Sequence, residues 1–226
     1  MTILGLILSL ISGICWTIVY ISMIRTGFKE KTYSMPLFAL SLNISWELIY
    51  TIKGFSTCIT NIQNYVNLTW CIFDFIIIYT YFKYGKNDFK ETAFKKYFIP
   101  WSILIFAMSF IIEYGFLIEF GESTSKSLPL VSSFIETSLG AWYSAFLQNL
   151  IMSLLFISLL FKRNSLLGQN RTIAICKCIG TLTPTILFGI ILENNLVLIL
   201  GSFCFIFDLI YIFLVFKYIS ISKILN

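Results

Sequence analysis

One ionisable side chain, Glu47, lies in the middle of an apolar run of this 226-residue sequence. The run is long enough for one tilted crossing of a bilayer, and Glu47 lies about 16 Å from Pro36 at ~1.5 Å per residue, near the midplane. Asn43, Trp46, Glu47 and Tyr50 recur at spacings of three and four, so they share one helix face. A carboxyl at this depth must face protein or a cavity, and it is a functional candidate. A polar patch between packed helices is the alternative.

Two further acids belong to an internal repeat. Residues 72–84 align with residues 206–218, which lie 134 positions later, and eight of the thirteen positions are identical. The match pairs Asp74 with Asp208. A pseudo-twofold axis along the membrane normal would set these acids on opposite walls of one cavity, near the level of Glu47. We therefore predict that the three carboxyls converge and are catalytic.

Buried carboxyls of this kind favour acid chemistry. Desolvation disfavours the charged form, so a carboxyl without a cation beside it is held neutral and becomes a proton donor. Neighbouring carboxyls in one dry pocket share their protons. We expect Lys177, within a later apolar segment, to lie too close to the cytoplasmic end to neutralise the group. The chain has no histidine, so imidazole is excluded as a base or metal ligand.

Aromatic residues are abundant around these acids. The chain has 23 Phe, 12 Tyr and 5 Trp, and ring faces stabilise carbocations while offering no nucleophile. An acid beside an aromatic pocket suits protonation of an alkene or epoxide, followed by cyclisation of a polyene. The side chains that we expect to contact such a substrate are Asn43, Trp46, Tyr50, Trp70, Tyr79, Phe207 and Tyr211.

Composition indicates the elements that position these residues. Hydrophobic residues make up 58% of the chain and charged residues 12%. Apolar segments recur along the whole length, as is typical of an all-α, polytopic membrane protein. The six cysteines lie mostly inside these segments and indicate no disulfide framework. We predict seven transmembrane helices, at residues 3–24, 36–53, 66–84, 98–119, 137–161, 173–192 and 196–216.

The repeat and the span count together predict the organisation of the chain. We expect one transmembrane domain over residues 1–226, built as a 3+1+3 parallel repeat. Its halves would be residues 1–97 and 132–226, and a linking helix would cover residues 98–119. The odd fourth span gives both halves the same orientation.

Charge asymmetry between the loops predicts the orientation. The loops on one side carry most of the lysine and arginine, so the positive-inside rule places the N-terminus outside and the C-terminus in the cytoplasm. The net charge of +5 therefore reflects topology and attraction to lipid headgroups, not nucleic-acid binding. The basic side is marked by Arg25, Lys29, Lys31, Lys83, Lys86, Lys90, Lys95, Lys96, Lys162, Arg163, Arg171, Lys217 and Lys223, and the opposite side has only Lys53 and Lys126.

Other polar residues in the spans are weaker candidates. Glu113 lies in the outer half of the fourth span, where it could face the cavity or reach water. Gln148 and Asn149 in the fifth span are typical of hydrogen bonds between helices.

The motif order Asn43-x-x-Trp46-Glu47-x-x-Tyr50, then Trp70 with Asp74, then Phe207-Asp208-Leu209-Ile210-Tyr211 resembles the small integral-membrane terpene cyclases of indole-diterpene and meroterpenoid pathways. The resemblance covers nearly the whole chain. It implies that Glu47 and Asp208 are the essential acids, and that cyclisation begins by protonation without a metal or another cofactor. It also implies a lipophilic prenylated substrate, with a prenyltransferase or epoxidase of the same pathway as a candidate partner. Consistently, the sequence contains no DDxxD or DxDD cluster.

A second function class shares the predicted architecture. Seven spans in a 3+1+3 repeat also describe sugar-transporter and PQ-loop carriers, which bind substrate at the midplane between the halves. A proton-coupled carrier is therefore the alternative function. The Pro-Gln dipeptide of that class is missing, and a pocket of carboxyls and aromatic rings is unusual for a sugar. A retinal-type receptor is disfavoured, because the last span has no lysine near its middle.

Overall fold

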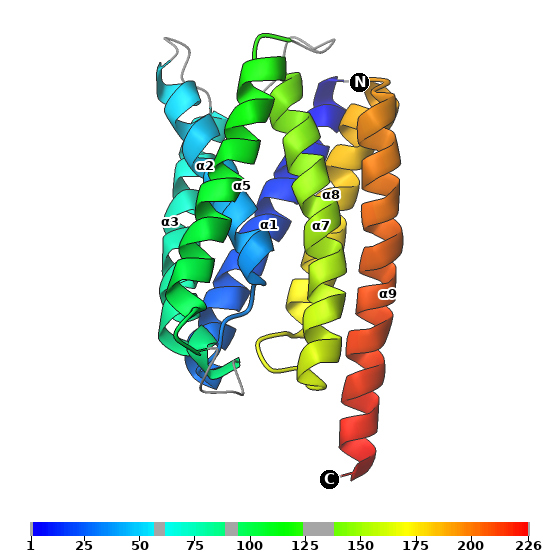
Figure 1. Ribbon diagram of the computed structural model, residues 1–226. Helices are drawn as coiled ribbons and strands as arrows, with labels where there is room; N and C mark the ends of the chain where they lie inside the picture. Colours follow the sequence, from blue (N-terminus) through cyan, green and yellow to red (C-terminus); the bar gives the residue numbers. More distant parts are fainter. Residues whose placement is uncertain (1, 57–61, 89–94, 124–137, 226) are drawn as a thin grey trace.

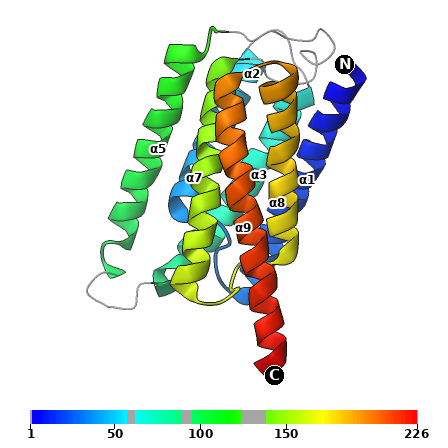
Figure 2. The same cartoon turned by 90° about the vertical axis from the view of Figure 1, so that its right-hand side faces the viewer.

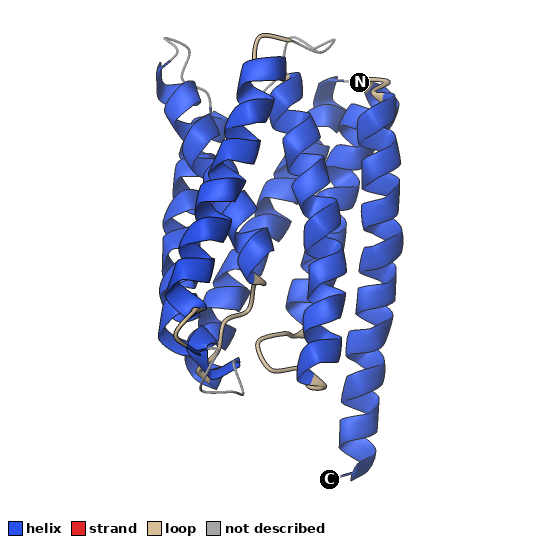
Figure 3. Cartoon of the chain, viewed as in Figure 1, coloured by secondary structure: helices blue, strands red, loops and turns tan. Residues whose placement is uncertain are grey.

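The computed structural model describes residues 2–56, 62–88, 95–123 and 138–225. These ranges are almost entirely helical, so the prediction of an all-α chain is confirmed (Figure 3). Lys90 and Lys126, used to predict the orientation, lie outside the described residues. The elements are α1 (Thr2–Glu30), α2 (Leu37–Ser56), α3 (Ile62–Tyr84), a 3₁₀ turn η1 (Gly85–Asp88), α5 (Phe98–Phe120), α7 (Leu139–Arg163), α8 (Arg171–Pro184), a π-helix η2 (Thr185–Ile191) and α9 (Asn195–Leu225).

Six helical segments in the described part of the chain are long and apolar enough to cross a membrane. They comprise α1, α3, α5, α7, α8 with η2, and α9, and many large apolar side chains on their outer faces are exposed. A water-soluble protein rarely exposes so much apolar surface. The chain is therefore a multi-pass membrane protein, as the sequence predicted.

The helix α2 is the seventh long helix, and its interior is interrupted by polar side chains. It carries Asn43, Glu47 and several hydroxyl residues, and it is not among the candidate membrane spans. Thirteen of its twenty residues are buried. Because α2 packs against α3, α5 and α7, its polar side chains are enclosed by protein. The predicted second span thus corresponds to an interior helix of the bundle.

The long helices contact one another in a closed ring. The order around the ring is α1, α3, α2, α5, α7, α9, α8 and back to α1, with an added contact between α2 and α7. Each half of the predicted repeat contains three helices: α1, α2 and α3 form the N-terminal triple, and α7, α8 and α9 form the C-terminal triple. In each triple, the third helix lies between the first and the second. This order is compatible with the 3+1+3 repeat, which stays a prediction. The two termini lie at opposite ends of the bundle (Figure 1).

The helix α5 lies at the edge of the bundle (Figure 2). Its buried residues form one stripe, and the remaining surface of the helix is largely exposed. Glu113 belongs to this stripe and is buried, whereas its neighbour Tyr114 is exposed. The carboxyl of Glu113 therefore faces the bundle and not the surrounding lipid.

A proline sets the local structure at the end of α8. Pro184 lacks a backbone N–H, and its ring clashes with the carbonyl one turn earlier, so the α-helical pattern is interrupted there. The chain continues as the π-helix η2, in which the N–H of Leu192 donates to the carbonyl of Leu187 at 3.0 Å. Wide turns of this kind are frequent at functional sites.

At the end of the bundle that contains the α1–α2 connection, three segments are joined by polar contacts. The Tyr33 hydroxyl donates to Asp88 at 2.6 Å, and the Arg163 guanidinium lies 3.2 Å from the same carboxylate. Arg163 also lies over the Tyr33 ring. Burial, followed by the hydrogen bond to Asp88, raises the pKa of Tyr33, so its hydroxyl remains a donor at neutral pH. These contacts fix the entry of the chain into α2.

Candidate active site

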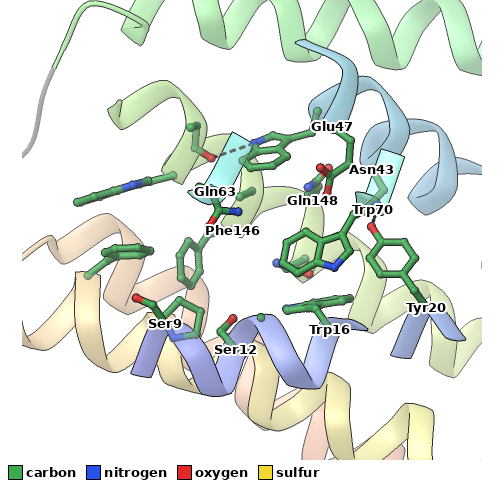
Figure 4. A pocket seen from close by; sticks show the side chains of 18 residues that line it. Ser9, Ser12, Trp16, Tyr20, Asn43, Glu47, Gln63, Trp70, Phe146 and Gln148 are labelled. Atoms are coloured by element: carbon green, nitrogen blue, oxygen red, sulfur yellow. Dashed lines mark hydrogen bonds between the residues drawn. The ribbon is translucent and has the colours of Figure 1, made fainter. Parts of the chain in front are cut away.

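A cavity of about 160 Å³ lies between α1, α2, α3, α7 and the junction of α8 with η2. One water needs only about 10–15 Å³ by a comparable measure, so the cavity has room for part of an organic molecule. Figure 4 shows side chains of α1, α2, α3 and α7 around it, with Glu47 among Trp16, Trp70 and Gln148. The cavity is partly open to the surroundings of the bundle.

Among the described residues that line this cavity, Glu47 alone carries a carboxyl group. Its side chain is 3% exposed, and its Oε2 atom has no hydrogen-bond partner among the described residues. The Tyr20 hydroxyl of α1 lies within interaction distance of this carboxyl. Glu47 thus combines a buried, unpaired carboxyl oxygen with a position in the cavity wall, so its carboxyl is a candidate to interact with a bound molecule.

A hydrogen-bonded network links Glu47 to Asp74. The amide of Asn43 donates to Asp74 Oδ2 at 2.7 Å and also to the Tyr20 hydroxyl. Asp74 is fully buried behind Asn43 and does not itself line the cavity. The hydrogen bonds of the Asn43 amide go to Tyr20 and Asp74 and not to Glu47 itself. The two carboxyls are thus neighbours in one network that contains no lysine or arginine.

Two tryptophans are anchored by their indole N–H groups, so their ring faces are free to line the cavity. Trp46 donates to the carbonyl of Ala141 at 3.0 Å, and Trp70 donates to the Thr17 hydroxyl at 3.1 Å. The Trp70 ring also stacks on Tyr20, with 5.9 Å between ring centroids. Satisfied N–H groups keep these rings in fixed orientations.

The opposite wall consists of rings from α7 and η2. Trp142 stacks on Phe188 with centroids 4.1 Å apart, and Phe146 meets Phe188 edge to face at 6.5 Å. All three rings line the cavity. The wide turn after Pro184 brings Phe188 into this wall. Aromatic and uncharged polar side chains therefore make up most of the cavity wall, and no lysine, arginine or cysteine occurs among its described lining residues.

Asp208 lies in a separate network and not on the cavity. Its Oδ1 atom is 2.7 Å from the Lys177 ammonium, and both side chains are 0% exposed. The expectation that Lys177 is too shallow to neutralise an acid was wrong. The prediction that all three carboxyls converge was also wrong, because Asp208 pairs with Lys177 instead of joining Glu47 and Asp74. Lys177 lies six residues into α8, about 9 Å from its start, and its four-carbon stem spans the remaining distance. The structure brings together Glu47 and Asp74 and pairs the third acid with a cation.

The other predicted contact residues divide by helix face. Asn43, Trp46 and Trp70 line the cavity with Glu47. Tyr79 is 53% exposed on the outer face of α3, near Phe28, because it follows the buried Ile77 by two residues and so points away from the bundle. This position corrects its assignment as a substrate contact.

Three more predicted contacts are absent from the cavity lining among the described residues. Tyr50 is buried beside the Trp46 ring, and Phe207 is half-buried on α9. Tyr211 packs edge to face on Phe156, and its hydroxyl has no hydrogen-bond partner among the described residues. The charge of Asp208, three residues earlier on α9, is balanced by Lys177.

Several cavity residues were not predicted from the sequence. One face of α1 lines the cavity, and its residues recur at spacings of three to four. They are Ser9, Ser12, Gly13, Trp16 and Tyr20. This polar and aromatic stripe in an otherwise aliphatic helix was a usable signal. Gln148, interpreted as a packing residue, has its Oε1 atom unpaired among the described residues and lines the cavity.

A sequence profile for Pyr4-like transmembrane terpene cyclases matches residues 1–222 of the chain. The Pyr4-family terpene cyclase mfmH of Annulohypoxylon moriforme is 24% identical over 78% of this chain and 66% of its own length. The terpene cyclase pyr4 of Aspergillus fumigatus is 25% identical over 76% of this chain and 65% of its own length.

The terpene cyclase andB of Emericella variicolor is more similar over a shorter region, at 32% identity over 46% of this chain. The chain spans slightly less than two thirds of the length of the first two relatives. No solved structure matches the chain.

Proposed function

Because the chain belongs to the Pyr4-like transmembrane terpene cyclases, we propose that it cyclises a lipophilic prenylated substrate inside the membrane and that Glu47 supplies the initiating proton. The observation that carries this proposal is the buried Glu47 carboxyl, with one unpaired oxygen, in the wall of a cavity that is also lined by aromatic rings. An enclosed carboxyl without a neighbouring cation favours the protonated form that a general acid needs.

The first step transfers the proton of the Glu47 carboxyl to a terminal alkene carbon or to an epoxide oxygen. The electrons of the alkene π bond form the new C–H bond, or the C–O bond of the epoxide breaks, and a carbocation results. Further π bonds of the same chain attack this cation in turn and close rings. Loss of a proton from carbon ends the reaction and allows Glu47 to be reprotonated. The product has the mass of the substrate, and no metal enters any step.

The aromatic walls have a defined part in this sequence. Ring faces attract a positive charge within about 6 Å of their centroids and do not form stable bonds with it. The rings of Trp16, Trp70, Trp142 and Phe188 line the cavity from different helices. They would stabilise successive cations as the charge moves along the substrate. The free Gln148 oxygen would hold a polar end of the same molecule.

The remaining acids have supporting roles in the proposal. Asp74 tunes Glu47 through Asn43 and Tyr20, because two coupled carboxyls titrate as a pair. The implication of the family resemblance that Asp208 is an essential acid stays a prediction, and the pairing of Asp208 with Lys177 favours an indirect role. The substrate would come from a prenyltransferase, and from an epoxidase as well where the initiating group is an epoxide. The carrier alternative is not favoured by the family membership.

The test is an assay of purified protein in detergent or lipid with prenylated aromatic substrates. Alkene-terminated and epoxide-terminated forms are offered separately, and products are identified by unchanged mass and altered retention. We expect one of the two forms to be converted by the wild type and not by Glu47→Gln. A matched control is Glu119→Gln, which changes a carboxyl outside the cavity.

Two results would contradict the proposal. The first is conversion by Glu47→Gln at the wild-type rate. The second is the absence of any isomeric product together with proton-driven uptake of a small molecule by proteoliposomes, which would favour the carrier.

A further inference from the structure

We propose that Lys177 is a positioning residue, and that the Lys177–Asp208 ion pair holds α8 and α9 in place without itself transferring a proton to the substrate. The proposal rests on the proposed cyclase function. It assigns to Asp208 a role different from that of Glu47, although both are buried acids of the same bundle.

The ion pair is enclosed on all sides by protein. The Lys177 ammonium lies 2.7 Å from Asp208 Oδ1 and donates to the Ser153 hydroxyl at 2.6 Å. Ser153 in turn donates to the carbonyl of Asn149. These contacts join α7, α8 and α9, the three helices of the C-terminal triple. Of these residues, only Asn149 lines the cavity.

The N-terminal triple contains a network in the same register. Lys177 lies 134 residues after Asn43, which is also the separation of Asp208 from Asp74. In each triple a side chain of the second helix donates at 2.7 Å to an aspartate of the third helix. The same donor also bonds to a hydroxyl of the first helix, Tyr20 in one triple and Ser153 in the other.

The two networks differ at the position where a proton donor is needed. The residue 134 positions after Glu47 is Thr181, which is buried but has no acidic proton to give. The amide of Asn43 is neutral and leaves the acids of its network without a cation. Lys177 instead supplies a full charge that balances Asp208. The C-terminal network is therefore built as a neutralised pair between helices.

The ion pair is connected to the cavity through α8. Three residues after Lys177, the carbonyl of Gly180 accepts a hydrogen bond from Ser12 of the cavity wall at 2.7 Å. One turn later the helix reaches Pro184 and then Phe188, both of which line the cavity. A shift of α8 would therefore move one aromatic wall relative to Glu47.

The experiment is a double-mutant cycle in the full-length protein. Lys177→Met and Asp208→Asn keep the approximate shapes of the side chains and remove the charges singly or together. Removal of one partner leaves a lone buried charge, whereas removal of both is often tolerated. We expect each single variant to lose about tenfold or more in kcat and the double variant to recover most of that loss, because contacting residues are not additive. Lys83→Met, on the exposed face of α3, is the control for loss of a lysine.

The rescue decides between the two roles of Asp208. If Asp208 only positions α9, the double variant regains turnover with the wild-type KM. A folded double variant that is as inactive as Asp208→Asn would overturn the proposal, because Asp208 would then be required for the chemistry.

A labelling measurement on the wild type remains decisive if the variants do not fold. The lipophilic reagent dicyclohexylcarbodiimide modifies protonated carboxyls that it can reach, and mass spectrometry locates the adduct. We expect modification of Glu47 in the cavity and none of Asp208, and equal modification of both would overturn the enclosed pair. Labelling and thermal stability need no substrate, so they test the pair even where no cyclisation is detected. Failure of the cyclase function would show only in the turnover of the wild type.

Discussion

The two triples of this bundle carry similar polar networks and differ in what surrounds them. In the N-terminal triple, Asn43 connects Asp74 to Tyr20, and Glu47 adjoins this network and faces a cavity. In the C-terminal triple, Lys177 neutralises Asp208, and neither residue lines that cavity. The same register of donor and aspartate therefore accompanies a cavity-lining acid in one half and a buried ion pair in the other.

The comparison shows how little must change to separate these roles. An amide in place of an ammonium leaves the carboxyls without a countercharge, and a glutamate in place of a threonine adds the transferable proton. Burial of an acid is common to both halves, so burial alone does not identify the proton donor. The partner of the acid and its access to a cavity do.

The largest effect is expected at Glu47, where the two halves differ most. Glu47→Gln keeps the shape of the side chain and removes the proton, and general acid catalysis contributes about 10²–10⁴ in rate. We therefore expect kcat to fall by a factor near the upper end of this range, about 10⁴, while the melting temperature stays unchanged. Product formation by purified protein is the measurement, and retention of more than about a tenth of the activity would count against this role.

A smaller effect is expected at Asp74, which acts on Glu47 through the network. Asp74→Asn should slow the reaction by about tenfold without abolishing it, since the acid itself remains. Rate measured against pH should change its profile, because one of two coupled carboxyls has been removed. Identical profiles for the wild type and the variant would show that Asp74 is not coupled to the acid.

A substitution at Gly13 can narrow the cavity and give the N-terminal half the residue that the C-terminal half has at the corresponding position. Gly13 lines the cavity with no atom within 4 Å of an added Cβ, and Leu147 lies 134 residues later. Gly13→Leu should reduce kcat/KM for the longest prenyl chain by about tenfold and affect shorter chains less, because pockets discriminate by size.

The matched control for this change is Gly115→Leu. Gly115 also has space for a side chain, but it lies on the exposed face of α5. Equal losses in both variants, or an equal loss for all chain lengths, would argue against a size limit at Gly13.

The smallest effect is expected at Thr181, the counterpart of Glu47. Its hydroxyl is buried without a hydrogen-bond partner among the described residues. Thr181→Val should leave turnover within about twofold and raise the free energy of unfolding by about 1 kcal/mol, because an unpaired polar group is removed. Thermal unfolding and the cyclisation assay check both parts. A large loss of turnover would mean that the C-terminal network contributes to the chemistry directly.

Sequence patterns were sufficient for the all-helical membrane character and for the position of Glu47. Apolar runs of sufficient length predict membrane helices, because hydropathy depends on local composition. The periodic spacing of Asn43, Trp46 and Glu47 correctly indicated one helix face, and all three line the cavity. The alignment of Asp74 with Asp208 correctly indicated that the two aspartates have corresponding positions. It did not show that they belong to two separate hydrogen-bond networks.

Only the tertiary structure decided which acid meets which partner. Hydropathy gives the approximate depth of a residue along a helix, but each step of one residue rotates the side chain by about 100°. Tyr79 consequently faces outward although it lies at a suitable depth, and Tyr20 of another helix reaches Glu47. Lys177 meets Asp208 because the packing of α8 against α9 and the reach of a long side chain determine that contact. Rotation and packing between helices depend on many side chains far apart in the sequence, and they are what separated the cavity-lining carboxyl of Glu47 from the buried ion pair of Asp208.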